Sequence, residues 1–143
     1  MVVDCLKRHG LRKRTKVIAS GKLINPDRVA AALSAGADFV TSARGFMFAL
    51  GCIQALQCNR NTCPTGIATH KKSLQRGLVP EVKAERVNRY QRTLEKEVGI
   101  IAHSCGVSEP RKLNRHHCWV VQQDGRSLMM SDLYPNVSPP ELS

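Results

Sequence analysis

Two stretches decide the fold class, Lys16-Val17-Ile18-Ala19-Ser20 and Asp38-Phe39-Val40-Thr41-Ser42. Each is a short run with β-branched or aromatic residues, which is typical of a buried strand. Between them, Asn25 can cap a helix that begins at Pro26 and is ended by Gly36. A strand, a helix and a second strand joined this tightly predict a parallel βαβ unit, and therefore an α/β fold.

The chain after this unit changes character. Glycines and prolines interrupt residues 43–70, where we expect a short helix over 46–50 followed by an irregular loop. A long amphipathic helix is predicted from Pro80 until Gly106 ends it. Its apolar residues recur at helical spacing on one face; they are Val87, Tyr90, Leu94, Val98 and Ile101.

The C-terminal part has a different pattern. Residues 118–122 and 127–130 flank an Asp124-Gly125 pair, which predicts a β-hairpin. The Pro-rich segment 135–143 is expected to be disordered. We therefore divide the chain into a main domain over 1–106, a helical and hairpin extension over 107–134, and a tail over 135–143.

Charge is the most unusual feature of the composition. The 143 residues carry a formal net charge of +11, and six basic residues fall between Lys7 and Lys16. Such a surface attracts anionic cofactors, acidic proteins or nucleic acid, or is simply solvated. One alternative is therefore a small basic metal module that binds nucleic acid. We expect no nucleic-acid partner, because helix-turn-helix, zinc-finger and RNP signatures are missing and aromatic residues make up only 4%.

Six cysteines are present, and three of them are clustered; the six are Cys5, Cys52, Cys58, Cys63, Cys105 and Cys118. The sequence shows no secretory leader pattern and no apolar run of membrane-spanning length. We therefore expect the reducing cytoplasm, where clustered cysteines bind metal or carry out redox chemistry. Burial is the expectation for Cys5, Cys105 and Cys118.

The clustered cysteines have the spacing Cys52-x5-Cys58-x4-Cys63, and Pro64 follows directly. Thiolates suit iron–sulfur clusters or zinc, but zinc sites generally show two close pairs of ligands, which this sequence does not have. Three close thiolates followed by proline favour an iron–sulfur cluster. Two alternatives remain open at this point: zinc with His70 as a fourth ligand, and cysteines that are merely packed.

Both predicted strands are followed by residues that suit a phosphate. Ser20, Gly21 and Lys22 follow the first strand, and Ala43 and Arg44 follow the second. Ligands of parallel α/β folds bind at the C-terminal ends of strands, and in (β/α)8 barrels the last two loops often hold a phosphate. A glycine with a basic residue is common in such turns, so the pattern alone leaves a purely structural role open.

With these residues in view, positions from about 15 to 103 resemble the C-terminal part of the FMN-binding synthase domain of glutamate synthases. The resemblance is carried by Ser20-Gly21-Lys22-Leu23, by Gly36-Ala37-Asp38, and above all by the cysteine segment that ends in Cys63-Pro64-Thr65-Gly66-Ile67-Ala68-Thr69. The shorter proteins of the FMN-binding glutamate synthase family are the most similar branch, and some of these are related to N-methylglutamate synthase subunits.

The resemblance implies a (β/α)8 barrel that binds FMN beside a 3Fe–4S cluster. It implies an oxidoreductase acting on CH–NH2 donors, in which 2-oxoglutarate and an ammonia donor yield L-glutamate, with ferredoxin or a reductase subunit as electron source. Cys52, Cys58 and Cys63 match the cluster ligands, and the two strand ends match the FMN site. Lys22 departs from the family, which has a second glycine there. A related enzyme with another amine donor, such as N-methylglutamate synthase, is the alternative.

The resemblance also implies that most of the barrel is missing from this chain. A complete barrel takes about 250 residues, and this sequence supplies what would be the last two strands. We therefore expect a fragment or one chain of a split enzyme, inactive alone, with the other strands supplied by a longer chain or a partner. No residue here is identified as catalytic.

Overall fold

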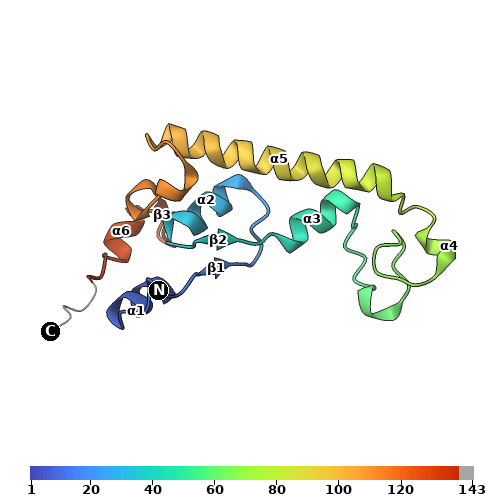
Figure 1. Ribbon diagram of the computed structural model, residues 1–143, viewed down its shortest axis with the longest axis horizontal. Helices are drawn as coiled ribbons and strands as arrows, with labels where there is room; N and C mark the ends of the chain where they lie inside the picture. Colours follow the sequence, from blue (N-terminus) through green and yellow to red (C-terminus); the bar gives the residue numbers. More distant parts are fainter. Residues whose placement is uncertain (139–143) are drawn as a thin grey trace.

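The computed structural model describes residues 1–138, and Figure 1 shows an elongated molecule with one long helix along its side. The first elements are α1 (Val2–Arg8), β1 (Ile18–Ala19), α2 (Pro26–Ser34), β2 (Phe39–Val40) and α3 (Ala43–Leu50). The cysteine loop contains the 3-10 turn η1 (Cys58–Arg60), followed by α4 (Lys72–Gln75) and the long α5 (Pro80–Ser104). The remaining elements are η2 (Pro110–Lys112), η3 (Arg115–His117), β3 (Trp119–Val121), β4 (Ser127–Met129) and α6 (Met130–Leu133).

The predicted parallel βαβ unit is confirmed. β1 and β2 pair in parallel, with Ile18 opposite Phe39 and Ala19 opposite Val40. Each strand is shorter than the five residues that the sequence suggested. Helix α2 begins at Pro26 as predicted, and the chain leaves it through Gly36 at a φ of 102°.

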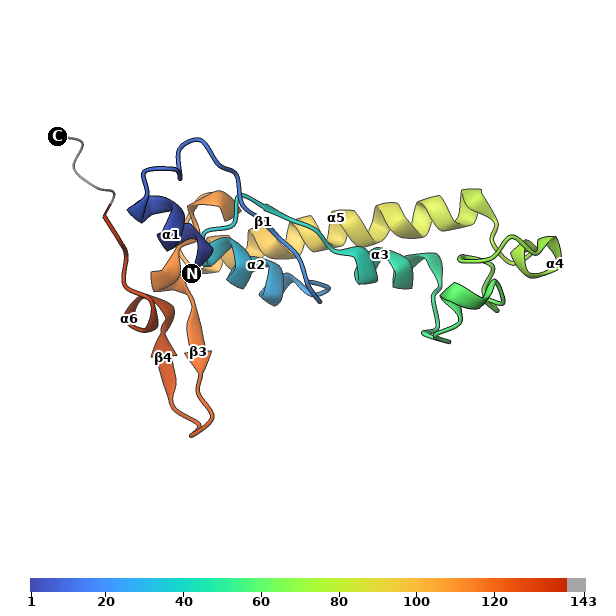
Figure 2. The ribbon, with the colours of Figure 1, turned by 90° about the horizontal axis from the view of Figure 1, so that it is seen from below.

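The core lies where α5 crosses α2. Ala30, Ala102 and Leu113 form its buried cluster, and Ala102 is completely shielded from solvent. The predicted apolar face of α5 is confirmed, because Val98 is buried and the other members of that face are half-buried. Figure 2 shows α2 and α3 in succession along the same side of α5, so one helix supports both.

The parallel strands are packed against helices on one face, whereas the opposite face is largely open apart from the Arg111 guanidinium, which lies 5.4 Å from the Phe39 ring centroid. Val40 lines an apolar hollow together with residues of α2, α3 and α5. Ile18 and Phe39, which share the opposite face, are 61% and 48% exposed. Within the described residues this sheet has two strands, and it forms no closed barrel.

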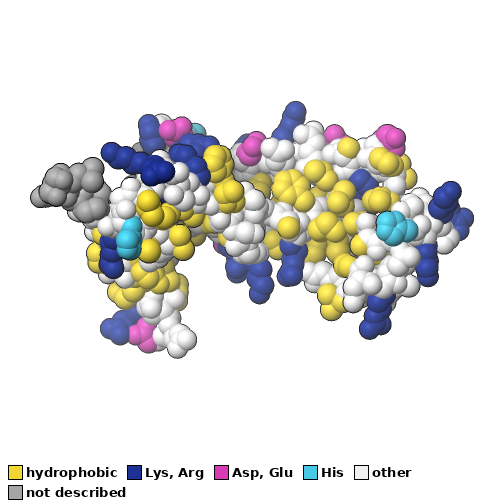
Figure 3. Space-filling model, turned by 60° about the horizontal axis from the view of Figure 1, so that its bottom comes forward, with side chains coloured by type: hydrophobic (Ala, Val, Ile, Leu, Met, Phe, Trp, Pro, Cys, Tyr) yellow, Lys and Arg dark blue, Asp and Glu magenta, His cyan; other side chains and the backbone are white. Residues whose placement is uncertain are grey.

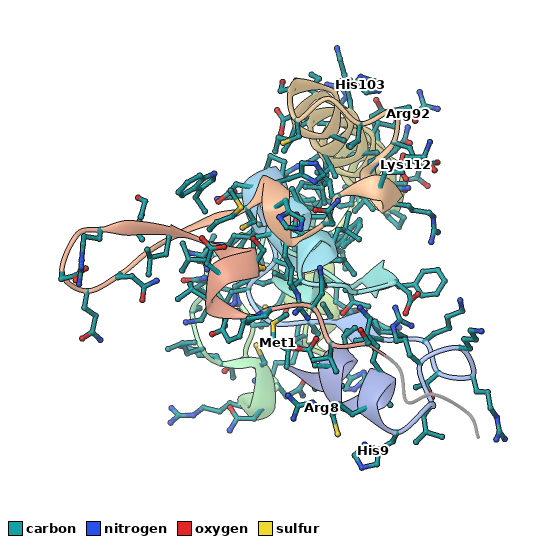
Figure 4. All side chains as sticks on the ribbon, turned by 90° about the vertical axis from the view of Figure 1, so that its left-hand side faces the viewer. Met1, Arg8, His9, Arg92, His103 and Lys112 are labelled. Carbon is teal, nitrogen blue, oxygen red and sulfur yellow. The ribbon has the colours of Figure 1, made fainter. Side chains whose placement is uncertain are left out.

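The C-terminal extension contains the predicted hairpin. β3 and β4 pair antiparallel, with Gly125 of the turn at a φ of 83°. Figures 2 and 4 show the hairpin leaving the body sideways. The extension is attached to the N-terminal helix by Arg115, whose guanidinium lies 2.6 Å from a carboxylate oxygen of Asp4.

Some elements differ from expectation. Helix α1 was not predicted, and α3 begins at Ala43 instead of Phe46. Disorder is expected for the tail over 135–143. Residues 139–143 of that tail lie outside the described residues. Among residues 1–138, no helix combines the length and apolar character that a membrane crossing needs.

Candidate functional site

The three clustered cysteines line one hollow of about 390 Å³ beside α3. Cys52 follows the left-handed turn at Gly51 that ends α3, Cys58 begins η1, and Cys63 lies at the start of the next turn. Most of the other lining side chains are apolar; they include Ala43, Met47, Phe48, Ile53, Ala55, Leu56 and Pro64. Figure 3 shows apolar side chains gathered over this end of the molecule.

Cys63 is the thiol best prepared to act as a ligand. It is buried, and its Sγ lies 3.3 Å from the Thr65 hydroxyl. That hydroxyl and the backbone N–H groups of Ala68, Thr65 and Ile67 lower the pKa of Cys63 to about 7, against the opposing effect of burial. A thiol with this pKa is substantially ionised at neutral pH, and the thiolate is the form that binds metals.

The cysteines share the hollow without converging on one point. Among residues 1–138, no three His, Cys, Asp or Glu side chains lie close enough together to hold a single metal ion. His70 lies outside the hollow and has an exposed side chain.

A polar network holds the segment that carries Cys63. Asn61 has a left-handed backbone, with a φ of 57°. Its backbone carbonyl oxygen accepts a hydrogen bond from the Thr69 hydroxyl at 2.8 Å, and its side-chain oxygen accepts one from the His70 backbone N–H at 2.6 Å. The Gln75 amide donates to the Thr69 carbonyl oxygen at 2.7 Å. These bonds explain why short polar residues flank the motif.

A second hollow, of about 380 Å³, lies at the ends of the parallel strands. Lys22 from the loop after β1, Arg28 from α2 and Arg44 from the first turn of α3 all line it. No ion pair involves these three cations within the described part of the chain. Three unneutralised cations and the N-terminus of α3 create a positive site that suits a phosphate.

The structure brings together only some of the residues predicted for this phosphate. Lys22 and Arg44 share the second hollow, and Arg44 also lines the cysteine hollow, as does Ala43. Ser20 and Gly21 line neither. Ala43 and Arg44 belong to a helix and not to the loop expected for them.

Lys22 occupies a left-handed backbone conformation, with a φ of 55°. That conformation costs a non-glycine residue about 1–2 kcal/mol. A glycine would adopt this conformation without that cost.

Arg28 was not identified from the sequence, although its place in the first turns of the helix after Lys22 could have indicated it.

Among the other cysteines, the burial expected for Cys5 is wrong. Cys5 is exposed, with its Sγ 3.8 Å from His9 Nδ1, and Figure 4 shows His9 at the surface near α1. Cys105 and Cys118 are half-buried.

Comparison with known proteins shows which family the chain belongs to. Residues 1–108 match the family described as "Conserved region in glutamate synthase". The chain is 43% identical over 133 residues to the glutamate synthase large subunit-like protein YerD of Bacillus subtilis, covering 92% of this chain. No solved structure matches it.

More distant relatives align over shorter segments. An archaeal glutamate synthase (NADPH) of Methanocaldococcus jannaschii is 33% identical over 76% of this chain. A ferredoxin-dependent glutamate synthase of Arabidopsis thaliana is 34% identical over 66% of it. The aligned regions span only 25%, 21% and 6% of the YerD, archaeal and plant proteins.

Proposed function

Because this chain belongs to the glutamate synthase family, we propose that it supplies the cluster ligands and the FMN-phosphate site of a glutamate synthase-type oxidoreductase. The complete enzyme would convert 2-oxoglutarate and an ammonia donor into L-glutamate. One observation carries this proposal: Arg44 lines both the cysteine hollow and the cationic hollow, so the two predicted cofactor sites are adjacent.

The residues present fit both cofactors. Cys52, Cys58 and Cys63 would hold the cluster as thiolates, and Thr65 and the neighbouring backbone N–H groups would stabilise the negative charge at Cys63. Lys22 and Arg44 would bind the FMN phosphate. When bound, FMN supplies hydride chemistry and the cluster supplies single-electron transfer.

We further propose that β1 and β2 are the last two strands of a (β/α)8 barrel. The exposed face that bears Ile18 and Phe39 supports this, because a barrel would bury it with side chains from the other strands. The remaining strands would come from a longer chain or from a partner. The isolated chain would then lack most of the flavin and substrate contacts and be inactive by itself.

The test is anaerobic reconstitution of the chain with iron and sulfide, followed by iron analysis, visible spectroscopy and EPR. We expect about three irons per chain and an EPR signal in the oxidised state. Cys58→Ser should lose both, whereas Cys5→Ser should keep both. The two substitutions are matched, because both cysteines are exposed but only Cys58 lines the hollow.

Two results would contradict the proposal. A colourless protein that binds one zinc would replace the cluster with a mononuclear site. Turnover of 2-oxoglutarate and ammonia by the purified chain would show that the missing strands are not needed.

A further inference from the structure

Tyr90 links three segments that are far apart in the sequence. Its hydroxyl donates to the carbonyl oxygen of Ile24 at 2.8 Å and lies 3.1 Å from the Ser42 hydroxyl. Ile24 belongs to the loop that follows β1, and Ser42 immediately precedes α3. One side chain of α5 therefore touches both segments that follow the parallel strands.

Two neighbours fix the Tyr90 ring itself. The ring packs edge-to-face against Phe46, with centroids 5.1 Å apart and planes at 88°. Gly45 lies directly beneath the hydroxyl, and a Cβ added there would overlap the Tyr90 side chain and lie 2.7 Å from Ser42 Oγ. The glycine in the first turns of α3 thus makes room for the tyrosine.

The segments held by Tyr90 carry the three cations of the second hollow. Lys22 lies two residues before Ile24, Arg44 two residues after Ser42, and Arg28 in the helix that this loop enters. Like charges around one hollow repel one another when no anion neutralises them. A neutral hydrogen bond that joins the two segments opposes this repulsion, and a site held in its binding geometry binds more tightly.

We propose that Tyr90 is a positioning residue for the FMN phosphate: its hydroxyl holds the Lys22 loop against the start of α3 and keeps the three cations around one anion. This role rests on the proposed function. It goes beyond that function because Tyr90 itself touches no phosphate and acts through the Ile24 carbonyl and the Ser42 hydroxyl.

The first test needs no flavin. Hydrogen–deuterium exchange is measured on the 143-residue chain, on Tyr90→Phe, and on Tyr134→Phe as a matched loss of one phenol hydroxyl at an exposed site. Tyr90→Phe should speed exchange in residues 21–25 and 42–45, with the rest of α5 unchanged. Unchanged exchange in these two segments, or faster exchange throughout the chain, would overturn the proposal.

The second test separates the phosphate from the ring system by comparing FMN with riboflavin in fluorescence titrations. Tyr90→Phe should weaken FMN binding by about 3- to 10-fold, as expected for one lost hydrogen bond, and leave riboflavin binding unchanged. Gly45→Ala should do the same through displacement of the ring, whereas Tyr134→Phe should change neither.

The outcomes distinguish this inference from the function on which it rests. If the unaltered chain binds FMN no better than riboflavin, the phosphate site itself is refuted. If it prefers FMN and Tyr90→Phe keeps that preference, only the role of Tyr90 is refuted.

Discussion

Arg115 shows how much of this fold depends on a single side chain. It is buried, it is ion-paired with Asp4, and its guanidinium also donates to the carbonyl oxygens of Tyr134 and Pro135 at 2.7 and 3.2 Å. The guanidinium thereby joins α1 to the C-terminal extension. Removing one partner of a buried pair leaves the other charge uncompensated, which is costly.

Asp4→Asn is therefore expected to lower the free energy of unfolding by about 3–5 kcal/mol at neutral pH. The matched control is Asp124→Asn, because Asp124 pairs with Arg126 at the surface, where the side chains are 47% and 80% exposed. Solvent screens exposed pairs, so the stability of this variant should be nearly unchanged. Urea denaturation measures both, and equal losses would contradict the assignment.

The same pair predicts a dependence on pH. Burial alone would raise the pKa of Asp4, but the Arg115 guanidinium and the amino terminus hold it below the ordinary value of 3.8. The pKa of Asp4 is lower in the folded protein than in the unfolded chain. The carboxylate therefore stabilises the fold fully above the unfolded pKa, and this stabilisation is lost as the pH falls through the folded pKa. The stability gap between Asp4→Asn and the unaltered chain should therefore narrow in urea titrations below pH 3.8.

At the scale of elements, the turn after Cys63 depends on a glycine. Gly66 has a φ of 80°, and a Cβ there would lie 2.6 Å from the Leu74 carbonyl oxygen and 2.9 Å from the Gln75 Cα. Both neighbours are backbone atoms, so a side chain at this position would force the turn away from α4. The motif glycine therefore shapes the segment that directs N–H groups at the Cys63 thiol.

Gly66→Ala should lower the free energy of unfolding by about 1–3 kcal/mol. It should also lower iron incorporation, because the N–H groups around Cys63 move with the turn. Gly99→Ala is the control, and it should raise the free energy of unfolding. Its Cβ would meet open space, and alanine inside a helix stabilises the fold by about 0.5–1 kcal/mol relative to glycine. Thermal denaturation with iron analysis measures both, and a Gly66→Ala protein that keeps its melting temperature and iron would contradict this reading.

At the scale of the whole molecule, one face of the parallel strands is largely exposed, and it is the face that the proposed barrel would bury. Ile18→Thr should change the free energy of unfolding of the isolated chain by less than about 0.5 kcal/mol, because Ile18 is 61% exposed. Val98→Ala, at a position only 5% exposed, should cost about 1–3 kcal/mol. Urea denaturation compares the two, and a large loss for Ile18→Thr would show that this face is already packed.

Local signals explain which parts of the fold could be predicted. Pro26, Gly36 and Gly106 mark helix ends through their own backbone preferences, so those boundaries agree with the structure. The predicted start of α3 is three residues late, because Gly45 suggests a helix break. Its real cause is the Tyr90 side chain, 45 residues further along the chain.

In the candidate site too, the residues with local sequence patterns could be predicted and those with distant partners could not. The cysteine motif and Lys22 with Arg44 were predictable because a spacing and a strand end are local patterns. The sequence had no such pattern for Tyr90 or for the Asp4–Arg115 pair, since their partners lie 66 and 111 residues away. Whether the three cysteines hold a cluster remains a prediction.

The length of α5 has a consequence for how relatives can vary. Its 25 residues extend over roughly 37 Å. One face must present Tyr90 to the start of α3 and, further along, Ile101 to the core cluster that includes Ala30 of α2 and Leu113 of the extension. A single inserted residue between these points would rotate one contact by about 100° relative to the other. Insertion of three or four residues would leave a smaller mismatch of about 60° or 40°, and insertion of seven residues only about 20°, so the spacing of the two contact sites tolerates whole turns far better than single residues.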